Sequence, residues 1–286
     1  MIYHRPNTIN DAVKALTEAQ GTASILAGGT DLLVQLRAGS NRPPNIVDIK
    51  GIKELMTISE NNDGFVIGAG VPSAKINEHQ GLKVAWPGVL ESMDLIGSTQ
   101  IQGRATMGGN LCNASPAADS VPAIIAAGAI CSIAGPQGIR EEKVENIVTG
   151  PGKTSLSKNE FVISLKLDKP KIGRGDAYLR LIPRTEMDIA VVGSAVCITI
   201  DDSGKCTDAK VVLGAVAPTQ VIVDSARDIL IGTKLDDNTI EKLAGAARNC
   251  CDPIDDKRGT IEYRTKIAGV LTKRAAKIAL KRAEKS

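Results

Sequence analysis

The sequence predicts an α+β protein with more than one domain. Its 286 residues approach the length at which a single hydrophobic core stops growing. Helical and strand patterns are mixed over the first part of the chain, whereas from about Gly175 two long strand patterns are followed by two helical ones. Strands followed by helices are typical of a separate α+β unit. We therefore expect a larger domain over residues 1–174 and a smaller α+β domain over 175–286.

The first fifty residues indicate a helix, a strand, a helix and a strand in turn. Thr8 is a suitable cap for a helix whose apolar stripe covers 12–19, because a threonine oxygen can accept from amides of the first turn. The stretch "ASILAGG" is typical of a short strand that ends in paired glycines. A second helix, "TDLLVQLRAG", ends at Gly39, and "NIVDI" follows as a strand. These elements predict a subdomain over about 1–53.

The pattern over about 54–174 predicts a second subdomain. "ELMTISENNDGFVIGAG" alternates around an Asn-Asn-Asp-Gly turn, which indicates a hairpin. A helical stretch near 90–96 precedes a long polar segment, "GSTQIQGRATMGGNLCNASPAAD", over 97–119. After it, "SVPAIIAAGAICSIAG" predicts a helix that leads into a strand, and "FVISLKL" predicts another strand.

The C-terminal part predicts two strands and two helices. "AVVGSAVCITIDDSGKCTDAKVVLGAV" indicates two long strands about an Asp-Asp-Ser-Gly turn, and "NTIEKLAGAARNC" and "YRTKIAGVLTKRAAKIALKRA" are amphipathic helical patterns. The last helix is strongly basic. We expect its charged face to be solvated, with a subunit contact as the alternative.

Composition narrows the class of protein. The net charge of +3 and the lack of a basic run mixed with aromatic residues argue against a nucleic-acid partner. No apolar stretch is long enough to span a membrane, and "MIYHRPNTINDAVKAL" has no apolar signal core, so we expect a cytoplasmic protein. The six cysteines have no C-x-x-C spacing and no histidine close to them in sequence. We therefore expect no metal site and free, mostly buried thiols.

Two segments with paired glycines are candidates for ligand binding, "LAGGTDLL" (26–33) and "TMGGN" (106–110). Glycine has no Cβ, so successive main-chain N–H groups can converge on an anion. Two such loops predict a diphosphate-containing cofactor. Neither is a G-x-G-x-x-G between a strand and a helix, which disfavours a Rossmann site. "IVTGPGKT" is not a Walker A motif, because Ile147 replaces its first glycine and Pro151 removes an amide.

Four segments in this order identify a family resemblance: "AGGTDLL", "ATMGGNLCNASPAADSVPA", "GPGKTSLSKNEFVISLKL" and "RLIPRTEMDIAVVGSAV". Together they resemble the FAD-binding medium subunit of the molybdenum hydroxylases, the family of xanthine dehydrogenase and carbon monoxide dehydrogenase. The resemblance covers essentially the whole chain. It implies an FAD-binding domain of the vanillyl-alcohol oxidase and p-cresol methylhydroxylase type, with two α+β subdomains, followed by a C-terminal domain of the CO dehydrogenase flavoprotein type.

The resemblance also implies which residues bind FAD. The two glycine loops would hold the pyrophosphate, through Ala27, Gly28, Gly29, Thr30 and Asp31 and through Thr106, Met107, Gly108, Gly109 and Asn110. Asp119 would contact the hydroxyl-bearing part of the cofactor, and main chain around Ile163 would reach the edge of the isoalloxazine ring.

Two further positions follow from the same resemblance. Arg180, where several relatives have lysine, would place a cation near flavin N1–C2 and favour the anionic reduced form. Ile189 would pack near the reactive face of the ring. A surface arginine on a strand and an ordinary core isoleucine are the alternatives for these two residues.

The implied chemistry is electron transfer, since no nucleophile or acid–base dyad is recognisable. The resemblance implies two partners, a large molybdopterin-binding subunit and a small iron–sulfur subunit, in a dimer of heterotrimers. The electron acceptor would be NAD or a quinone. Thr30 and Asp31 stand where the best-defined carbon monoxide dehydrogenases tend to have histidine and serine. Two other functions stay open: a non-catalytic flavin-binding assembly subunit, and a stand-alone flavin oxidase of the vanillyl-alcohol oxidase type, tethered through Cys112.

Overall fold

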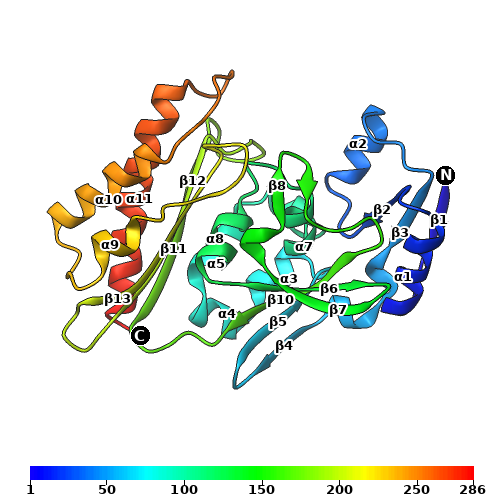
Figure 1. The fold of residues 1–286 in the computed structure, drawn as a ribbon, viewed down its shortest axis with the longest axis horizontal. Coiled ribbons are helices and arrows are strands. Elements are labelled where there is room, and N and C mark those ends of the chain that lie inside the picture. Colours follow the sequence, from blue (N-terminus) through cyan, green and yellow to red (C-terminus); the bar gives the residue numbers. More distant parts are fainter.

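Three main sheets with their helices follow one another along the long axis of the protein in the computed structural model, which describes residues 1–286 (Figure 1). The N-terminal sheet lies at one end, and two long C-terminal helices close the other end. The predicted α+β class is confirmed. None of the helices combines the length and the apolar character needed to cross a bilayer.

The N-terminal unit is a small parallel sheet with two helices. Its strands, in the order β1-β3-β2, are β1 (Ile2–His4), β2 (Ala23–Leu26) and β3 (Asn45–Asp48), and its helices are α1 (Ile9–Glu18) and α2 (Leu32–Ala38). Thr8 caps α1 by accepting from the Asp11 amide at 3.1 Å, and Gly39 ends α2 with a φ of 73°. The four elements predicted for this region are confirmed.

The second sheet is antiparallel and has the order β4-β5-β10-β6-β7. Asn61 shapes the predicted hairpin turn, since its Oδ1 accepts from the amides of Asp63 and Gly64. The strands are β4 (Ile58–Asn61), β5 (Gly64–Gly68), β6 (Ile130–Gly135), β7 (Gly138–Lys143) and β10 (Phe161–Asp168), and a separate hairpin comprises β8 (Val148–Gly150) and β9 (Lys153–Thr154).

Six helices connect β5 to β6, and two of them lie inside the polar segment 97–119. Thr106 caps the second of these two, accepting from the Gly109 amide at 2.9 Å, and Leu111 anchors it in the core. The segment is therefore partly helical. The six helices are α3 (Ser73–Glu78), α4 (Gln80–Ala85), α5 (Pro87–Asp94), α6 (Thr99–Gln102), α7 (Met107–Cys112) and α8 (Ser120–Ala126).

The third sheet has the order β11-β12-β13-β14 and is antiparallel. The predicted pair of long strands and the two predicted C-terminal helices are present. The elements are β11 (Arg174–Leu181), β12 (Val192–Ile200), β13 (Cys206–Gly214), β14 (Val221–Ile222), α9 (Ala226–Leu230), α10 (Asp237–Asn249) and α11 (Ile261–Ala283). In Figure 1, α10 and α11 lie on one face of this sheet, and α5 and α8 lie on the other.

Helices on both faces bury most of the third sheet. Tyr178, Ala195 and Cys197 belong to the core that the sheet forms with α5 and α8, whereas Val196 and Ile198 belong to a second core with α10 and α11. Successive side chains of a strand point to opposite faces. The alternation along β12 therefore joins the two hydrophobic cores through a single sheet.

Arg282, near the end of α11, ties this outer helix to the inner layer. Its Nη1 donates to the Asp176 carbonyl oxygen at 2.7 Å and to Glu91 on α5 at 3.2 Å, and its Nη2 also contacts Glu91. The same carboxylate accepts from the Tyr178 amide at 3.0 Å. One ion pair thus holds α11, β11 and α5 together.

The basic face of α11 is partly neutralised within the chain. Lys273 and Lys277 pair with Glu241 at 2.8 Å and with Asp237 at 2.7 Å, both on α10. Lys266, Arg274 and Lys281 are exposed, as expected of a solvated face. A subunit contact at this face stays a prediction.

We expect Arg282→Ala to lower the free energy of unfolding by about 1–2 kcal/mol, because the partly buried Glu91 would lose its cation. Urea denaturation measures the change. Lys281→Ala is the matched control, since Lys281 is the exposed neighbour on the same helix, and its effect should stay within about 0.5 kcal/mol. Equal losses for the two variants would contradict this role of Arg282.

Candidate functional site

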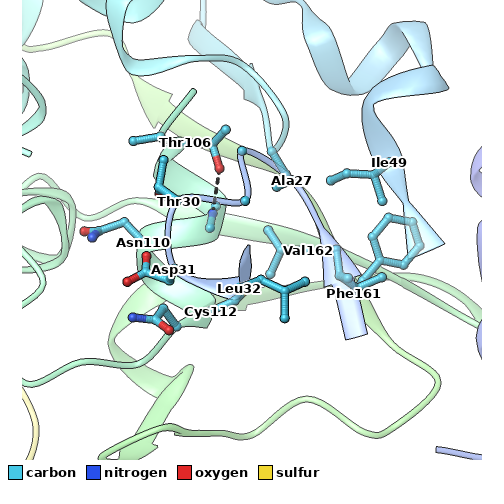
Figure 2. A pocket seen from close by; sticks show the side chains of 18 of the residues that line it. Ala27, Thr30, Asp31, Leu32, Ile49, Thr106, Asn110, Cys112, Phe161 and Val162 are labelled. Atoms are coloured by element: carbon cyan, nitrogen blue, oxygen red, sulfur yellow. Dashed lines mark hydrogen bonds between the residues drawn. The ribbon is translucent and has the colours of Figure 1, made fainter. Parts of the chain in front are cut away.

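The two glycine loops meet at one cavity of about 270 Å³. In Figure 2, Thr30 and Asp31 of the first loop lie toward Thr106 and Asn110 of the second, and Ile49 and Phe161 lie on the opposite side. Nine of the ten predicted loop residues line this cavity: Ala27, Gly28, Gly29, Thr30, Asp31, Thr106, Gly108, Gly109 and Asn110. The structure thus brings the two motifs together.

Gly28 and Gly29 are required for different reasons. A Cβ at Gly28 would lie 1.8 Å from the carbonyl oxygen of Arg104, so only glycine lets the first loop pack on the main chain that precedes the second. Gly29 has a φ of +81°, which an L side chain rarely adopts. The close approach to the Arg104 carbonyl therefore requires glycine at position 28, and the positive φ favours glycine at position 29.

Main-chain amides of both loops are left without acceptors in the protein. No oxygen of the chain accepts from the amides of Gly28, Gly29, Thr30 and Asp31. In the second loop, the Thr106 hydroxyl oxygen accepts a hydrogen bond from the Gly109 amide (Figure 2). Met107 and Gly108 belong to the first turn of α7, and first-turn amides have no partner within their own helix. Free amides that surround one cavity suit an anion.

The lining contains no lysine, arginine or histidine. Its carboxylates are Asp31 and Glu160. Desolvation raises the pKa of Asp31, whereas the ion pair with Arg140, at 2.8 Å, holds the pKa of Glu160 at about 2. An anion here would therefore be held by neutral amides. The opposite wall is apolar and suits a planar ring; it comprises Ile25, Ile49, Leu156, Phe161 and Val162.

Met107 and Ile163 do not line the cavity, although each is next in sequence to a residue that does. The Met107 side chain is 1% exposed and belongs to the core. Ile163 lies at an irregularity of β10, where the register with β6 shifts between Val162 and Ser164, and its carbonyl accepts from the Ala69 amide at 2.9 Å. Irregularities of this kind often occur beside functional sites.

Asp119 and Arg180 form a buried ion pair outside the cavity lining. Arg180 Nη1 donates to Asp119 Oδ2 at 2.6 Å, and the Tyr178 hydroxyl donates to Oδ1 at 3.0 Å. The Arg180 side chain is only 4% exposed, so the alternative of a surface arginine is wrong. Burial raises the pKa of Asp119 to about 6, against the opposing effects of Arg180 and Tyr178.

This cluster adjoins the cavity through Asn110. The Asn110 side chain lines the cavity, and its Oδ1 accepts from the amide and the hydroxyl of Ser120, at 3.2 and 2.6 Å. Ser120 directly follows Asp119. A chain of hydrogen-bonded protein groups therefore connects the wall of the cavity with the ion pair.

Ile189 lies on the loop between β11 and β12 and is 52% exposed, so it is not a core isoleucine. Its amide donates to Asp188, which is held by Arg184 at 3.2 Å and by Arg258 at 2.9 Å. The same loop contacts the start of the polar segment, where the Met187 amide donates to the Gly97 carbonyl at 3.2 Å. The loop thus lies between the polar segment and the C-terminal part of the chain.

A larger cavity of about 450 Å³ lies elsewhere, beside β12, β13 and the end of α8. Its three cationic side chains are paired with carboxylates, Lys210 with Glu145, and Arg174 and Arg227 both with Asp208. It therefore offers no free positive charge for an anion. The smaller cavity at the glycine loops is the candidate site.

Comparison with protein families agrees with this site. Residues 1–170 match the FAD binding domain in molybdopterin dehydrogenase, and residues 177–279 match the CO dehydrogenase flavoprotein C-terminal domain. The chain belongs to the FAD-binding medium subunits of the molybdenum hydroxylases, as the sequence resemblance predicted, and it is an oxidoreductase subunit.

Known relatives cover nearly the whole chain. The carbon monoxide dehydrogenase medium chain of Afipia carboxidovorans is 34% identical over 99% of this chain and 97% of its own length. The putative xanthine dehydrogenase FAD-binding subunit of Escherichia coli is 30% identical over 95% of this chain and 93% of its own. A carbon monoxide dehydrogenase structure from Hydrogenophaga pseudoflava superimposes with a TM-score of 0.94, at 30% identity and with coverage of 99% and 98%.

The geometry fits FAD. Unpaired amides of both loops suit the diphosphate, and the apolar wall suits a ring system. FAD is larger than this cavity, so part of it must lie beyond the loops. Outside the cavity lining, the buried Arg180 Nε has no partner in the protein, and a buried donor of this kind needs an acceptor.

We expect Gly28→Ala to weaken FAD binding at least about tenfold, because a Cβ would force the first loop away from Arg104 and spread the amides. Titration of flavin fluorescence measures the affinity. Gly103→Ala is the control, because Gly103 precedes Arg104 and its Cβ would meet only one atom, at 3.6 Å. Unchanged affinity in Gly28→Ala would show that the contact with Arg104 does not shape the site.

Proposed function

We propose that this chain passes electrons through FAD, from iron–sulfur clusters of a small partner subunit to NAD, a quinone or another acceptor. A large partner subunit would carry molybdopterin and oxidise the substrate, in a dimer of heterotrimers. The cavity of unpaired amides between two glycine loops, in a chain of the FAD-binding medium-subunit family, supports the proposal best. Relatives named for carbon monoxide and for xanthine leave several substrate classes open.

In this proposal the residues of the chain bind and orient the cofactor. Bound FAD supplies the capacity to take up and release electrons. Amides of 28–31, together with the Thr30 hydroxyl, hold the diphosphate from one side, and those of Met107 and Gly108 hold it from the other. Two titratable groups of the lining are unsuited to act as bases, because Glu160 is ion-paired and Cys112 is a protonated thiol with a pKa of about 12. Asp31 is the lining carboxylate without an ion pair, and we assign it to the binding loop and not to proton transfer.

We assign the remaining predicted residues to other parts of bound FAD. Main chain at Ile163 would meet the edge of the isoalloxazine ring, and Arg180 would lie near N1–C2. Ile189, exposed on its loop, would cover the reactive face. Asp119 would lie beside the hydroxyl-bearing part of FAD, although both of its oxygens already accept hydrogen bonds from the protein.

We also propose that the chain divides near residue 174. The FAD-binding domain would cover 1–174, with subdomains of about 1–53 and 54–174, and the C-terminal domain would cover 175–286. The separate helix layer of α10 and α11, with a core of its own, supports this division.

Purification of the tagged chain from its native cell tests the proposed function. We expect a yellow complex with one FAD per chain and with molybdenum and iron in companion chains. Added FAD at 100 times its dissociation constant should stabilise the isolated apoprotein by about 2.7 kcal/mol. Flavin that neither NADH nor the partner subunits can reduce would favour a non-catalytic assembly subunit instead.

A covalent flavin would indicate a stand-alone oxidase, and Cys112 is the thiol that lines the cavity (Figure 2). Burial raises its pKa to about 12, so the nucleophilic thiolate is scarce at neutral pH. We expect acid precipitation to leave all of the flavin in the supernatant, both for the wild type and for Cys112→Ser. Yellow precipitate from the wild type alone would contradict this expectation and identify Cys112 as the tether.

A further inference from the structure

The side chain of Lys50 contacts the main chain of the first glycine loop. Its ammonium group donates to the carbonyl oxygen of Ala27 at 3.0 Å. Ala27, Gly28 and Ile49, the residue before Lys50, all line the cavity (Figure 2), whereas Lys50 does not. A cation therefore lies beside the loop without entering the cavity.

This contact fixes the orientation of one peptide group. The carbonyl of Ala27 and the amide of Gly28 belong to the same planar unit, and in a trans peptide the two point in opposite directions; the chain has no cis peptide bonds. Because the carbonyl is turned toward Lys50, the N–H is turned away from it. No oxygen of the chain accepts from this amide, so it is available to a ligand in the cavity.

The hydrogen bond to the carbonyl also strengthens the amide as a donor. Hydrogen bonds that follow one another through a peptide group polarise each other, and a bond from a charged donor is about twice as strong as a neutral one. Lys50 thus shifts positive charge toward the Gly28 amide. This effect suits a cavity whose own lining has no lysine, arginine or histidine.

Lys50 is itself held by the N-terminal sheet. Asp48 Oδ1 accepts from the Lys50 ammonium group at 2.7 Å and from the Lys50 amide at 3.0 Å, and the Tyr3 hydroxyl donates to Oδ2. The Asp48 side chain is only 6% exposed. Burial opposes its ionisation, but the hydrogen bonds from Lys50 and Tyr3 outweigh burial and keep the pKa of Asp48 below its usual range.

The parallel sheet places this carboxylate where the loop begins. Asp48 ends β3 and pairs with Leu26, the last residue of β2, and the carboxyl ends of parallel strands meet at one edge. Ala27 directly follows Leu26. The ionised Asp48 therefore keeps the ammonium group of Lys50 within reach of the first peptide of the glycine loop.

We propose that Lys50 is a positioning residue for the diphosphate of FAD: its ammonium group holds the Ala27 carbonyl, so that the Gly28 amide faces the phosphates as a strengthened donor. This inference rests on the proposed binding of FAD. The glycine loop would then owe part of its affinity for an anion to a lysine that does not touch the anion.

Titration of flavin fluorescence tests this role, with the full chain purified together with its companion subunits and then freed of flavin. Lys50→Met keeps the length of the side chain but loses the donor and the charge, and it should weaken FAD binding about tenfold. Lys50→Arg retains a cation and should stay within about threefold of the wild type. Lys53→Met is the matched control, since Lys53 is a nearby exposed lysine, and it should change the affinity less than about twofold.

A double variant keeps the test valid if the fold is weakened. Lys50→Met leaves the buried Asp48 carboxylate without its cation, which destabilises the protein. Asp48→Asn combined with Lys50→Met removes both charges and should show the same loss of about tenfold in FAD affinity. Melting temperatures of the flavin-free proteins serve as the control for folding.

ADP as a competitor of FAD locates the effect. It carries the same diphosphate, so Lys50→Met should weaken its binding by the same factor as that of FAD. A loss for FAD alone, with ADP unaffected or not bound, would place the effect away from the diphosphate and overturn the inference.

The other outcomes separate this inference from the proposed function. Unchanged FAD affinity in Lys50→Met and in the double variant would overturn the inference and leave the proposed function intact. A loss that Lys50→Arg shares in full would overturn it too, because a cation at this position would then not matter. Failure of the wild type to bind FAD would instead refute the proposed function, and this inference with it.

Discussion

The contact of main chain with main chain at Gly28 is the constraint on which the rest of the site depends. The first loop approaches the Arg104 carbonyl so closely that no side-chain carbon fits between them. This contact joins the N-terminal parallel unit to the polar segment that carries the second loop. Amides from two distant parts of the chain therefore point into one cavity. The two loops can therefore offer donors to one diphosphate from two sides.

The amide-lined cavity and the buried ion pair are separate features of the molecule. The cavity has no cationic lining and holds two carboxylates, so its attraction for an anion comes from amide dipoles. The buried cation Arg180 lies outside this lining and is compensated by Asp119. The glycine loops therefore offer an anion neutral donors and no fixed positive charge.

The parts of the fold that the sequence predicted are those with local causes. Thr8 caps its helix, Gly39 ends another, and Asn61 shapes a hairpin turn, because each acts within a few residues. The paired glycines were recognised for the same reason. The helices inside the polar segment were not predicted, since such short helices depend on tertiary packing, here of Leu111, rather than on propensity.

The rest of the site could not be predicted because its parts come from separate elements. Its apolar wall combines Ile25, Ile49, Leu156 and Phe161 from four segments, each of which has the pattern of an ordinary core residue. An arginine on a strand is exposed by default. Only the fold brings Asp119 to Arg180 and Tyr178, so the burial of Arg180 cannot be deduced from its neighbours in sequence.

The third sheet supplies the hydrogen-bond partners of Asp119, the last residue of the polar segment. Both glycine loops precede this sheet, yet Arg180 and Tyr178 lie on its strand β11, and its two faces belong to two different cores. Without β11, Asp119 would face the apolar layer with no cation, and a buried carboxylate in that setting becomes protonated. The loops would keep their amides, but the ion pair would be lost. The two parts of the chain must therefore pack together before Asp119 has its buried cation.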